Sequence, residues 1–327
     1  MKAPEFWRHD GALARLLAPA AWAYRIGADL NRRRVTPARA DAPVICIGNL
    51  VAGGAGKTPT ALAIAGILRR RGRQPHFLTR GYGGRLAGPV RVDPARHPVT
   101  DVGDEALLLA ARAPTWLAHD RVAGAKAAIA DGAEIIVMDD GFQNPSLIKD
   151  LSILVIDAGY GLGNTRLLPA GPLREPAARG FGRANAIILI ETAGALDRAP
   201  LPALPKHLPV LPARLIPDED AMRLAGRRVF AFAGIGRPEK FFQTVRSVGA
   251  DLVGQRSFRD HHVYDPQEIM RMVEDADAVD AIPVTTAKDH VRLPVEAQPM
   301  VEILNVHLEF AAPATVAELL DSVAADA

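Results

Sequence analysis

The feature that most constrains this chain is a glycine-rich turn between an apolar run and a segment that favours a helix. The run Val44–Ile47 predicts a buried parallel strand, and the helix is expected to begin at Thr58. The turn and the start of the helix read Gly53, Gly54, Ala55, Gly56, Lys57, Thr58 and Pro59. A strand, a glycine loop, Lys-Thr and a helix in this order are typical of a phosphate-binding P-loop, in which backbone N–H groups and the helix N-terminus face an anion.

The residues of this loop predict a nucleoside triphosphate site. Lys57 would contact the β- and γ-phosphates, and the hydroxyl of Thr58 would bind Mg²⁺. The match has one departure, because Val51 stands where the motif usually has its first glycine. A glycine-rich turn beside an ordinary surface lysine is the alternative, but the order of strand, loop and helix favours the P-loop.

Composition limits the class of protein. The chain has 327 residues, of which 49% are hydrophobic, so it is long enough for two domains. Its formal net charge of +2 gives no indication of a nucleic-acid partner. The single cysteine, Cys46, excludes a disulfide within the chain and favours the cytoplasm. We expect no signal peptide, because charged residues precede a broken apolar stretch, and no spanning helix, because no apolar run approaches about 18 residues.

The order of predicted elements indicates the fold class. From Val44 onward, short apolar strands alternate with helical patterns, which predicts a P-loop NTPase-like parallel sheet covered by helices on both faces. We expect three regions: an N-terminal helical segment (1–40), a P-loop core (41–220) and a smaller C-terminal α/β domain (221–327). The proline-rich stretch 196–220 is expected to be a linker or a wrapped connection, and Gly88–Val92 a small hairpin. Gly234-x-Gly236 after a strand is only a weak indication of a second nucleotide site, because Glu239 replaces the third glycine.

Residues 1–40 differ from the rest of the chain. Apolar side chains, among them Trp7 and Trp22, recur at roughly helical spacing, and Pro19 is expected to interrupt the pattern. Arginines follow, including the cluster Arg32–Arg34. This composition is typical of a helix that lies at an anionic membrane surface. A helix packed on the main domain would show the same pattern, so the sequence leaves both interpretations open.

Acidic residues stand at two positions where they could serve catalysis. Asp139 and Asp140 end an apolar strand, where acids of P-loop proteins bind Mg²⁺ directly or through water, although two acids at a strand end also make a common turn. Asp104 lies at a predicted helix start, and a helix cap is the stronger interpretation from the residue alone. Arg174, in the long loop 159–176, would either neutralise charge on a transferring phosphate or pair with Glu175 or another acid.

Together these segments resemble the tetraacyldisaccharide 4′-kinase family of the lipid A pathway, from the N-terminal helix to about Leu293. Several short motifs, in the family's order, carry the resemblance. They are Gly48-Asn49, the loop 53–59, Thr79–Gly83, Val102–Glu105, Asp139–Gln143, Gly163-Asn164, Leu168–Glu175, Phe232–Gly236, Phe258, Asp260-His261 and Lys288-Asp289. The variant first position of the P-loop is itself a trait of this family.

The resemblance implies ATP, Mg²⁺ and transfer of the γ-phosphoryl group to the 4′-hydroxyl of an acylated glucosamine disaccharide 1-phosphate. It implies that Asp104 is the base for the sugar hydroxyl, helped by His261, and that Thr58 and an acid of the Asp139/Asp140 pair hold the metal. It also implies a site between two domains at the cytoplasmic face of the bacterial inner membrane, with the protein bound peripherally. No nucleic acid and no obligate protein partner are expected.

The sequence departs from the family in two places. Asn144-Pro145 stand where the family usually has histidine and a basic residue, and Thr286-Ala287-Lys288-Asp289 lacks the glutamate of the family's Thr-Glu-Lys-Asp. The main rival interpretation is a membrane-associated regulatory P-loop ATPase, whose signature lysine is replaced here by Ala52. A GTPase lacks support because the Thr/Asn-Lys-x-Asp motif is absent, and Lys57, Thr58 and both aspartates argue against an inactive lipid-binding protein.

Overall fold

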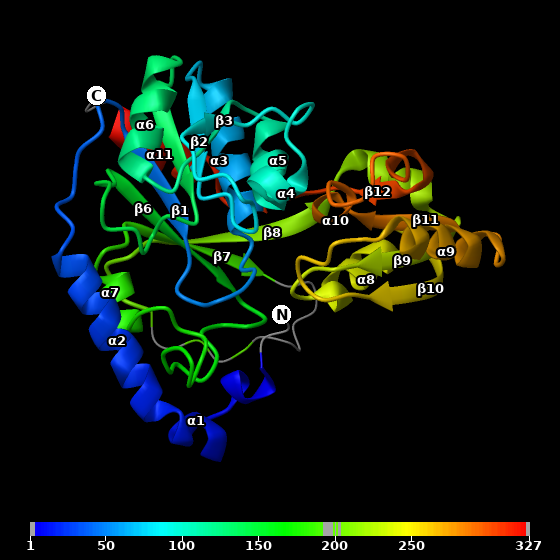
Figure 1. Cartoon of the computed structure of the whole chain (residues 1–327), viewed down its shortest axis with the longest axis horizontal. Helices are drawn as coiled ribbons and strands as arrows, with labels where there is room; N and C mark the ends of the chain where they lie inside the picture. The colour runs from blue at the N-terminus through cyan, green and yellow to red at the C-terminus, as the bar shows by residue number, and fades with distance from the viewer. Residues whose placement is uncertain (1–3, 192–198, 200, 202–203, 325–327) are drawn as a thin grey trace.

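The architecture is that of a computed structural model, which describes residues 4–191, 199, 201 and 204–324. Figure 1 shows a larger domain around a central sheet and a smaller domain beside it. The central sheet has the strand order β13-β8-β7-β6-β1-β5-β2-β4-β3. Its strands are β1 (Val44–Gly48), β2 (Pro75–Thr79), β3 (Val90–Arg91), β4 (Thr115–Leu117), β5 (Ile135–Asp139), β6 (Leu151–Asp157), β7 (Ala186–Glu191), β8 (Val210–Pro217) and β13 (Val306–Phe310).

Helices cover both faces of this sheet, as predicted. One apolar core lies under α3 (Lys57–Arg70), α5 (Asp104–Ala110) and α11 (Pro313–Ala324), and a second lies under α6 (Arg121–Ala130) and α7 (Ala177–Phe181). Because both faces are covered, β1, β5 and β6 are buried along their whole length, which explains their continuous apolar runs. The strands from β8 to β4 pair in parallel, and the sheet carries an antiparallel strand at each edge.

The smaller domain is a second parallel sheet, of order β10-β9-β11-β12. Its strands are β9 (Arg228–Ala233), β10 (Asp251–Ser257), β11 (Ile282–Thr286) and β12 (Glu302–Leu304), and its helices are η2 (Glu219–Leu224), α8 (Pro238–Ser247), α9 (Pro266–Asp277), α10 (Ala287–His290) and η3 (Gln298–Met300). Phe241 and Phe242 of α8 pack on one face, and Ile269 and Met272 of α9 belong to a core around Phe232 on the other. The predicted second α/β unit is therefore present.

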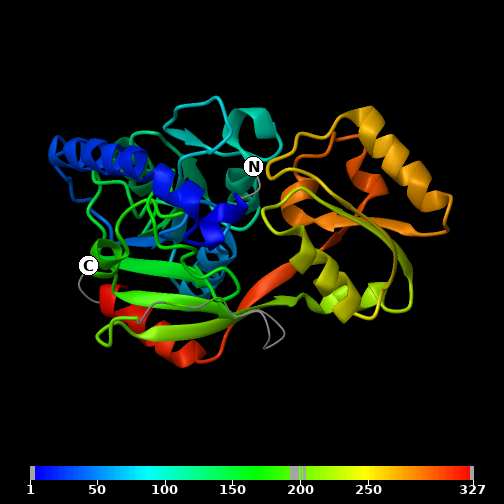
Figure 2. The same cartoon turned by 90° about the horizontal axis from the view of Figure 1, so that it is seen from below.

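The expected extent of the C-terminal domain, 221–327, is corrected by the strand pairing. Strand β13 pairs antiparallel with β8, and Leu308 and Phe310 join the core of the large sheet together with α11. The smaller domain thus spans about 218–305. Two chain segments, which continue β8 and β13, connect it to the larger domain, and Figures 1 and 2 show them running between the domains. The two crossings touch, because Asp218 N–H donates to Asn305 O at 3.0 Å.

Two further expectations about local structure are wrong. The proline-rich stretch 196–220 is not only a connection, since β8 occupies its second half; residues 196–198, 200 and 202–203 lie outside the described residues. In β8 the side chains alternate, with Leu211 and Ala213 buried between exposed neighbours. The expected hairpin at Gly88–Val92 is instead β3, which pairs with β4.

The N-terminal segment forms η1 (Glu5–Arg8), α1 (Ala12–Leu16) and α2 (Ala18–Arg33) along one side of the larger domain (Figure 2). Pro19 lies in the first turn of α2, where a proline fits, and the interruption falls just before it at Leu17. Across the described residues, no helix has the length and apolar character needed to cross a membrane.

Candidate active site

The P-loop connects β1 to α3 and has the geometry of an anion cradle. Gly56 precedes the helix with φ of +84°, and a Cβ there would lie 2.4 Å from Ile190 Cδ1, so only glycine fits. A Cβ at Gly53 or Gly54 would meet no atom within 4 Å, which leaves open space beside the loop. The loop therefore fits a bound phosphate chain, with Ala55 buried beneath it.

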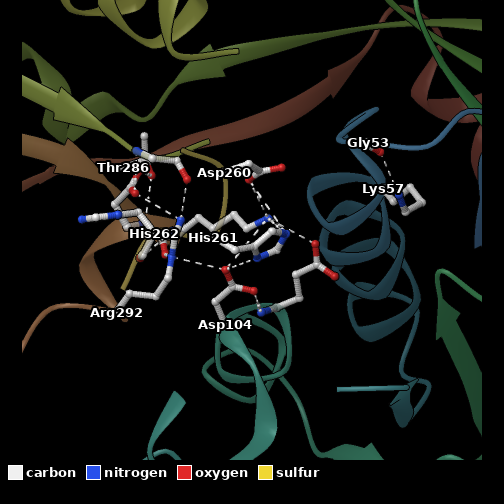
Figure 3. Close-up of polar contacts among 12 residues, drawn as sticks. Gly53, Lys57, Asp104, Asp260, His261, His262, Thr286 and Arg292 are labelled. Atoms are coloured by element: carbon white, nitrogen blue, oxygen red, sulfur yellow. Dashed lines mark hydrogen bonds and ion pairs between the residues drawn. The ribbon is translucent and has the colours of Figure 1, made fainter. Parts of the chain in front are cut away.

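Lys57 begins α3 and lies across this loop. Its Nζ is 3.4 Å from Gly53 O and 3.7 Å from Asp140 Oδ2, and its side chain is only 7% exposed (Figure 3). A buried ammonium group with so few partners is available to the phosphates of a nucleotide. Pro59 follows in the first turn of α3, where its missing N–H is not needed.

Thr58 and Asp139 meet at the adjoining strand ends. The hydroxyl of Thr58 donates to Asp139 Oδ2 at 2.9 Å, while Asp139 Oδ1 is buried without a hydrogen-bond partner. Burial, together with the charge of Glu105, raises the pKa of Asp139 to about 7. Within the described part of the chain no three His, Cys, Asp or Glu side chains form a metal cluster. An unpartnered carboxylate oxygen beside a hydroxyl fits Mg²⁺, which takes one or two carboxylates and completes its shell with water and phosphate.

The neighbouring Asp140 has different partners. Arg174 contacts it with both terminal nitrogens, at 2.9 and 3.3 Å. Burial alone would raise the pKa of Asp140, but the charges of Lys57 and Arg174 outweigh it and hold that pKa below the ordinary value. Glu175 pairs instead with Arg183, so of the two predicted pairings for Arg174 the structure shows the one with another acid. Asp139 and Asp140 therefore occupy separate environments.

Asp104 lies at the junction of the two domains. It begins α5 of the larger domain and is 2% exposed, and its Oδ2 is 2.9 Å from Nδ1 of His261 in the smaller domain (Figure 3). Lys288 Nζ lies 3.4 Å from Nε2 of His261. Because an ammonium group only donates, a neutral His261 carries its proton on Nδ1 and donates it to Asp104. The side chain of Asp104 also accepts from Glu105 N–H, so it has a local capping contact as well.

Cations surround Asp104 on the side of the smaller domain. Arg292 Nε is 3.3 Å and Lys288 Nζ 4.0 Å from its Oδ2. Burial by itself would raise the pKa of Asp104, but the hydrogen bond from His261 and the charges of Lys288, His261 and Arg292 outweigh burial and lower that pKa. Asp104 is therefore held as a carboxylate.

Sequence reasoning did not assign Lys288 or Arg292 to the site. Lys288 was visible only as part of a family motif, and it lies 3.3 Å from Glu105. Arg292 gave no signal, because a cation just after a short helix is ordinary. The adjacent histidines separate: His261 contacts Asp104, whereas His262 pairs with Glu268 at 2.7 Å inside the smaller domain.

A cavity of about 350 Å³ lies between α2 and the loops that follow β2, β5 and β6. Its lining carries arginines from α2, from the loop after β2 and from the segment after β6, namely Arg25, Arg32, Arg80, Arg174 and Arg179. Pro145 also lines it, whereas the side chain of Asn144 accepts hydrogen bonds from Ser146 and Leu147 within its own loop. At the family's histidine position the side chain thus stabilises a turn.

Known proteins resemble nearly the whole chain. The family described as tetraacyldisaccharide-1-P 4′-kinase matches residues 13–325. The tetraacyldisaccharide 4′-kinase of Rhodospirillum rubrum is 51% identical over 98% of this chain and 97% of its own, and that of Gluconacetobacter diazotrophicus is 53% identical over 98% of each. A solved structure of the Aquifex aeolicus enzyme in complex with ATP is 25% identical, covers 95% of this chain and 99% of its own, and has a TM-score of 0.74. The chain belongs to the tetraacyldisaccharide-1-phosphate 4′-kinase family.

Proposed function

We propose that the protein transfers the γ-phosphoryl group of ATP to the 4′-hydroxyl of an acylated glucosamine disaccharide 1-phosphate, giving the bisphosphorylated lipid and ADP. The family and the relatives at about half identity support an ATP-dependent kinase of lipid A biosynthesis. The observation that carries the residue assignment is the contact of Asp104 with His261 at the domain junction, where α5 packs beside α3, the helix that begins at Lys57 (Figure 3). At this junction His261 of the smaller domain contacts Asp104 of the larger domain.

The P-loop side of the site binds the nucleotide. Gly53–Gly56 offer backbone N–H groups to the phosphates, and Lys57 places its charge on the β- and γ-phosphates. Thr58 and Asp139 would hold Mg²⁺, which neutralises phosphate charge when bound. Asp140 orients Lys57 and Arg174, and Arg174 stabilises charge on the transferring group.

The junction side of the site prepares the acceptor. Asp104 accepts the proton of the 4′-hydroxyl as the new O–P bond forms, while the bond from the γ-phosphorus to the bridging oxygen of ADP breaks. His261 orients the carboxylate and stabilises its ionised form. Because Asp104 is only 2% exposed, the acceptor can reach it only when the smaller domain moves away from the larger one. When the smaller domain moves back, it excludes water from the site.

The arginine-lined cavity suits the other end of the acceptor. A phosphate attracts guanidinium groups, which bind it through paired N–H donors. Arg174 reaches both this cavity and Asp140, so the cavity adjoins the catalytic face. We assign it to the 1-phosphate of the disaccharide.

The N-terminal helices bring this site to the membrane. Several apolar side chains of α1 and α2 are exposed, among them Leu16 at 76% and Trp22 at 67%. Trp7 instead donates to Pro169 O at 3.0 Å, and Arg32 lies 3.6 Å from Glu175, so the segment is also anchored on the larger domain. These contacts support a helix docked on the larger domain. Its exposed apolar side chains would face anionic lipid, which we assign to the cytoplasmic side of the inner membrane.

The test is a transfer assay with γ-labelled ATP, Mg²⁺ and the acylated disaccharide 1-phosphate in detergent. We expect the label at the 4′-oxygen, located by ³¹P NMR, and no steady turnover of ATP without the acceptor. Sustained ATP hydrolysis without transfer would instead identify a regulatory ATPase.

A further inference from the structure

The turn that carries His261 is held by a buried arginine of the smaller domain. The side chain of Arg292 is 2% exposed, and its terminal nitrogens donate to His262 O and to Gly234 O, both at 3.1 Å. Gly234 O also accepts the N–H of His261 at 3.2 Å. One guanidinium thus fixes the turn on both sides of His261, whose φ of +59° is unusual for a residue with a side chain.

The same arginine reaches across the domain junction. Its Nε donates to Lys288 O at 2.9 Å and lies 3.3 Å from Asp104 Oδ2, the oxygen that also contacts His261. Its orientation is fixed by Asp289, which is fully buried and whose Oδ1 is 3.1 Å from Nη2 of Arg292. The buried Oδ1 of Asp289 also accepts from Tyr264 and from Gly234 N–H.

We propose that Arg292 is a positioning residue that builds the Asp104–His261 pair when the smaller domain meets the larger one. The inference rests on the proposed function, because Arg292 acts only through that pair. A planar guanidinium with fixed partners can hold the turn that carries His261 and, at the same time, keep a permanent positive charge beside the carboxylate of Asp104. A lysine would keep the charge but would not reproduce the paired donors.

The charged groups around Asp104 set the expected pH response. From the smaller domain His261, Lys288 and Arg292 face its carboxylate, and on its own helix Glu105 follows it. Asp260 lies behind, 3.8 Å from His261 and 3.9 Å from Lys288. Removing the charge of Arg292 leaves Asp104 easier to protonate, so the acidic limb of the rate profile moves to higher pH.

The experiment compares Arg292→Gln and Arg292→Lys with the control Arg256→Gln, whose side chain is 47% exposed on the same domain. We expect Arg292→Gln to lower kcat about 100-fold, to move the acidic limb up by about one pH unit and to leave the Kd of Mg-ATP within about twofold. Arg292→Lys should leave the acidic limb of the pH–rate profile at its wild-type position, and its kcat should lie between those of Arg292→Gln and the wild type. The control should match the wild type.

A double-mutant cycle separates positioning from mere folding. In an Asp104→Asn background Arg292→Lys should lower the residual rate no further, because its effect passes through Asp104. An additive loss there, or a wild-type kcat for Arg292→Lys, overturns the inference; the lysine variant decides the matter even if Arg292→Gln does not fold. If Asp104→Asn keeps full activity, Asp104 is not the base, and both the proposed function of this residue and the inference about Arg292 are wrong. If Asp104→Asn is inactive while both Arg292 variants have normal activity, only the inference about Arg292 is wrong.

Discussion

The site has a nucleotide side and an acceptor side, which are built differently. On the nucleotide side, Lys57 and Thr58 follow β1 and Asp139 ends β5, and these two strands of one buried sheet pair directly. On the acceptor side, Asp104 contacts His261 and Arg292, which belong to another domain and lie far away in the sequence. The first arrangement is fixed by the fold of one domain. The second exists only while two domains that share a two-stranded connection are in contact.

This difference predicts which functions a substitution changes. Altering the nucleotide side should impair nucleotide binding and turnover together, because both use the same rigid loop. Altering the acceptor side should lower turnover and leave nucleotide binding intact. Variants on each side therefore test whether the two parts are separable.

The largest effect is expected for Lys57→Ala. Loss of the charge on the transferring phosphate should lower the transfer rate by about 10³-fold or more and also weaken Mg-ATP binding. Calorimetric titration with Mg-ATP and a rate assay measure the two effects. The control is Lys126→Ala, an exposed lysine on α6. Near-normal turnover in a folded Lys57→Ala protein contradicts the P-loop assignment.

His261→Ala should change only the acceptor side. Losing the group that orients Asp104 should lower kcat by about 10- to 100-fold, while the Kd of Mg-ATP stays within about twofold. The exposed His207 offers a matched control as His207→Ala. If Mg-ATP binding weakens as much as kcat falls, the two sides are not separable.

The stability of the metal-free protein should depend on Asp139. Its folded-state pKa is raised from the ordinary 3.8 to about 7, so the folded state binds the proton more tightly than the unfolded chain does. The resulting stabilisation is complete below about 3.8 and is lost as pH rises through about 7. Between these limits the melting temperature should decline with pH more steeply for the wild type than for Asp139→Asn. Differential scanning calorimetry in chelator measures both slopes, and equal slopes would refute the raised pKa.

The double variant Leu16→Ser/Trp22→Ser is expected to have the smallest effect on turnover in detergent, which should stay unchanged. These side chains face solvent on the N-terminal helices, so their loss should weaken binding to anionic phospholipid vesicles by about tenfold or more. Val295→Ser, which alters a 75% exposed side chain of the smaller domain, is the control. Sedimentation with vesicles at low and high salt is the measurement. Unchanged binding of the double variant would place the membrane contact elsewhere.

The nucleotide side could be predicted from the sequence because its chemistry is local. The loop around Lys57 and the acids at the end of β5 each belong to one short motif, and parallel strands bring their carboxyl ends to one edge. The acceptor side could not be derived in this way. Asp104 alone indicates a helix cap, and its pairing with His261 was implied only by the family resemblance. Arg292 was missed because its contacts with Asp104, His262 O and Gly234 O join residues that lie far apart in the sequence.

The same distinction holds for the fold. Continuous apolar runs such as β5 and β6 predicted buried parallel strands correctly. Strand β8 was not predicted, because Pro212 and Pro217 indicated a connection rather than a strand. The buried Leu211 and Ala213 nevertheless alternate with exposed residues, as in a strand. The return of β13 to the large sheet depends on pairing with β8, which no local pattern encodes.

The most direct test of the account is a single-turnover measurement on Asp104→Asn with saturating Mg-ATP and the acylated acceptor. Asparagine keeps the shape of the side chain and its contact with Glu105 N–H but cannot take the proton. We expect the Kd of Mg-ATP to match the wild type, and the rate of transfer to fall by about 10²- to 10⁴-fold. Transfer at the wild-type rate would show that Asp104 has only a structural role and would contradict the assignment of catalysis to the domain junction.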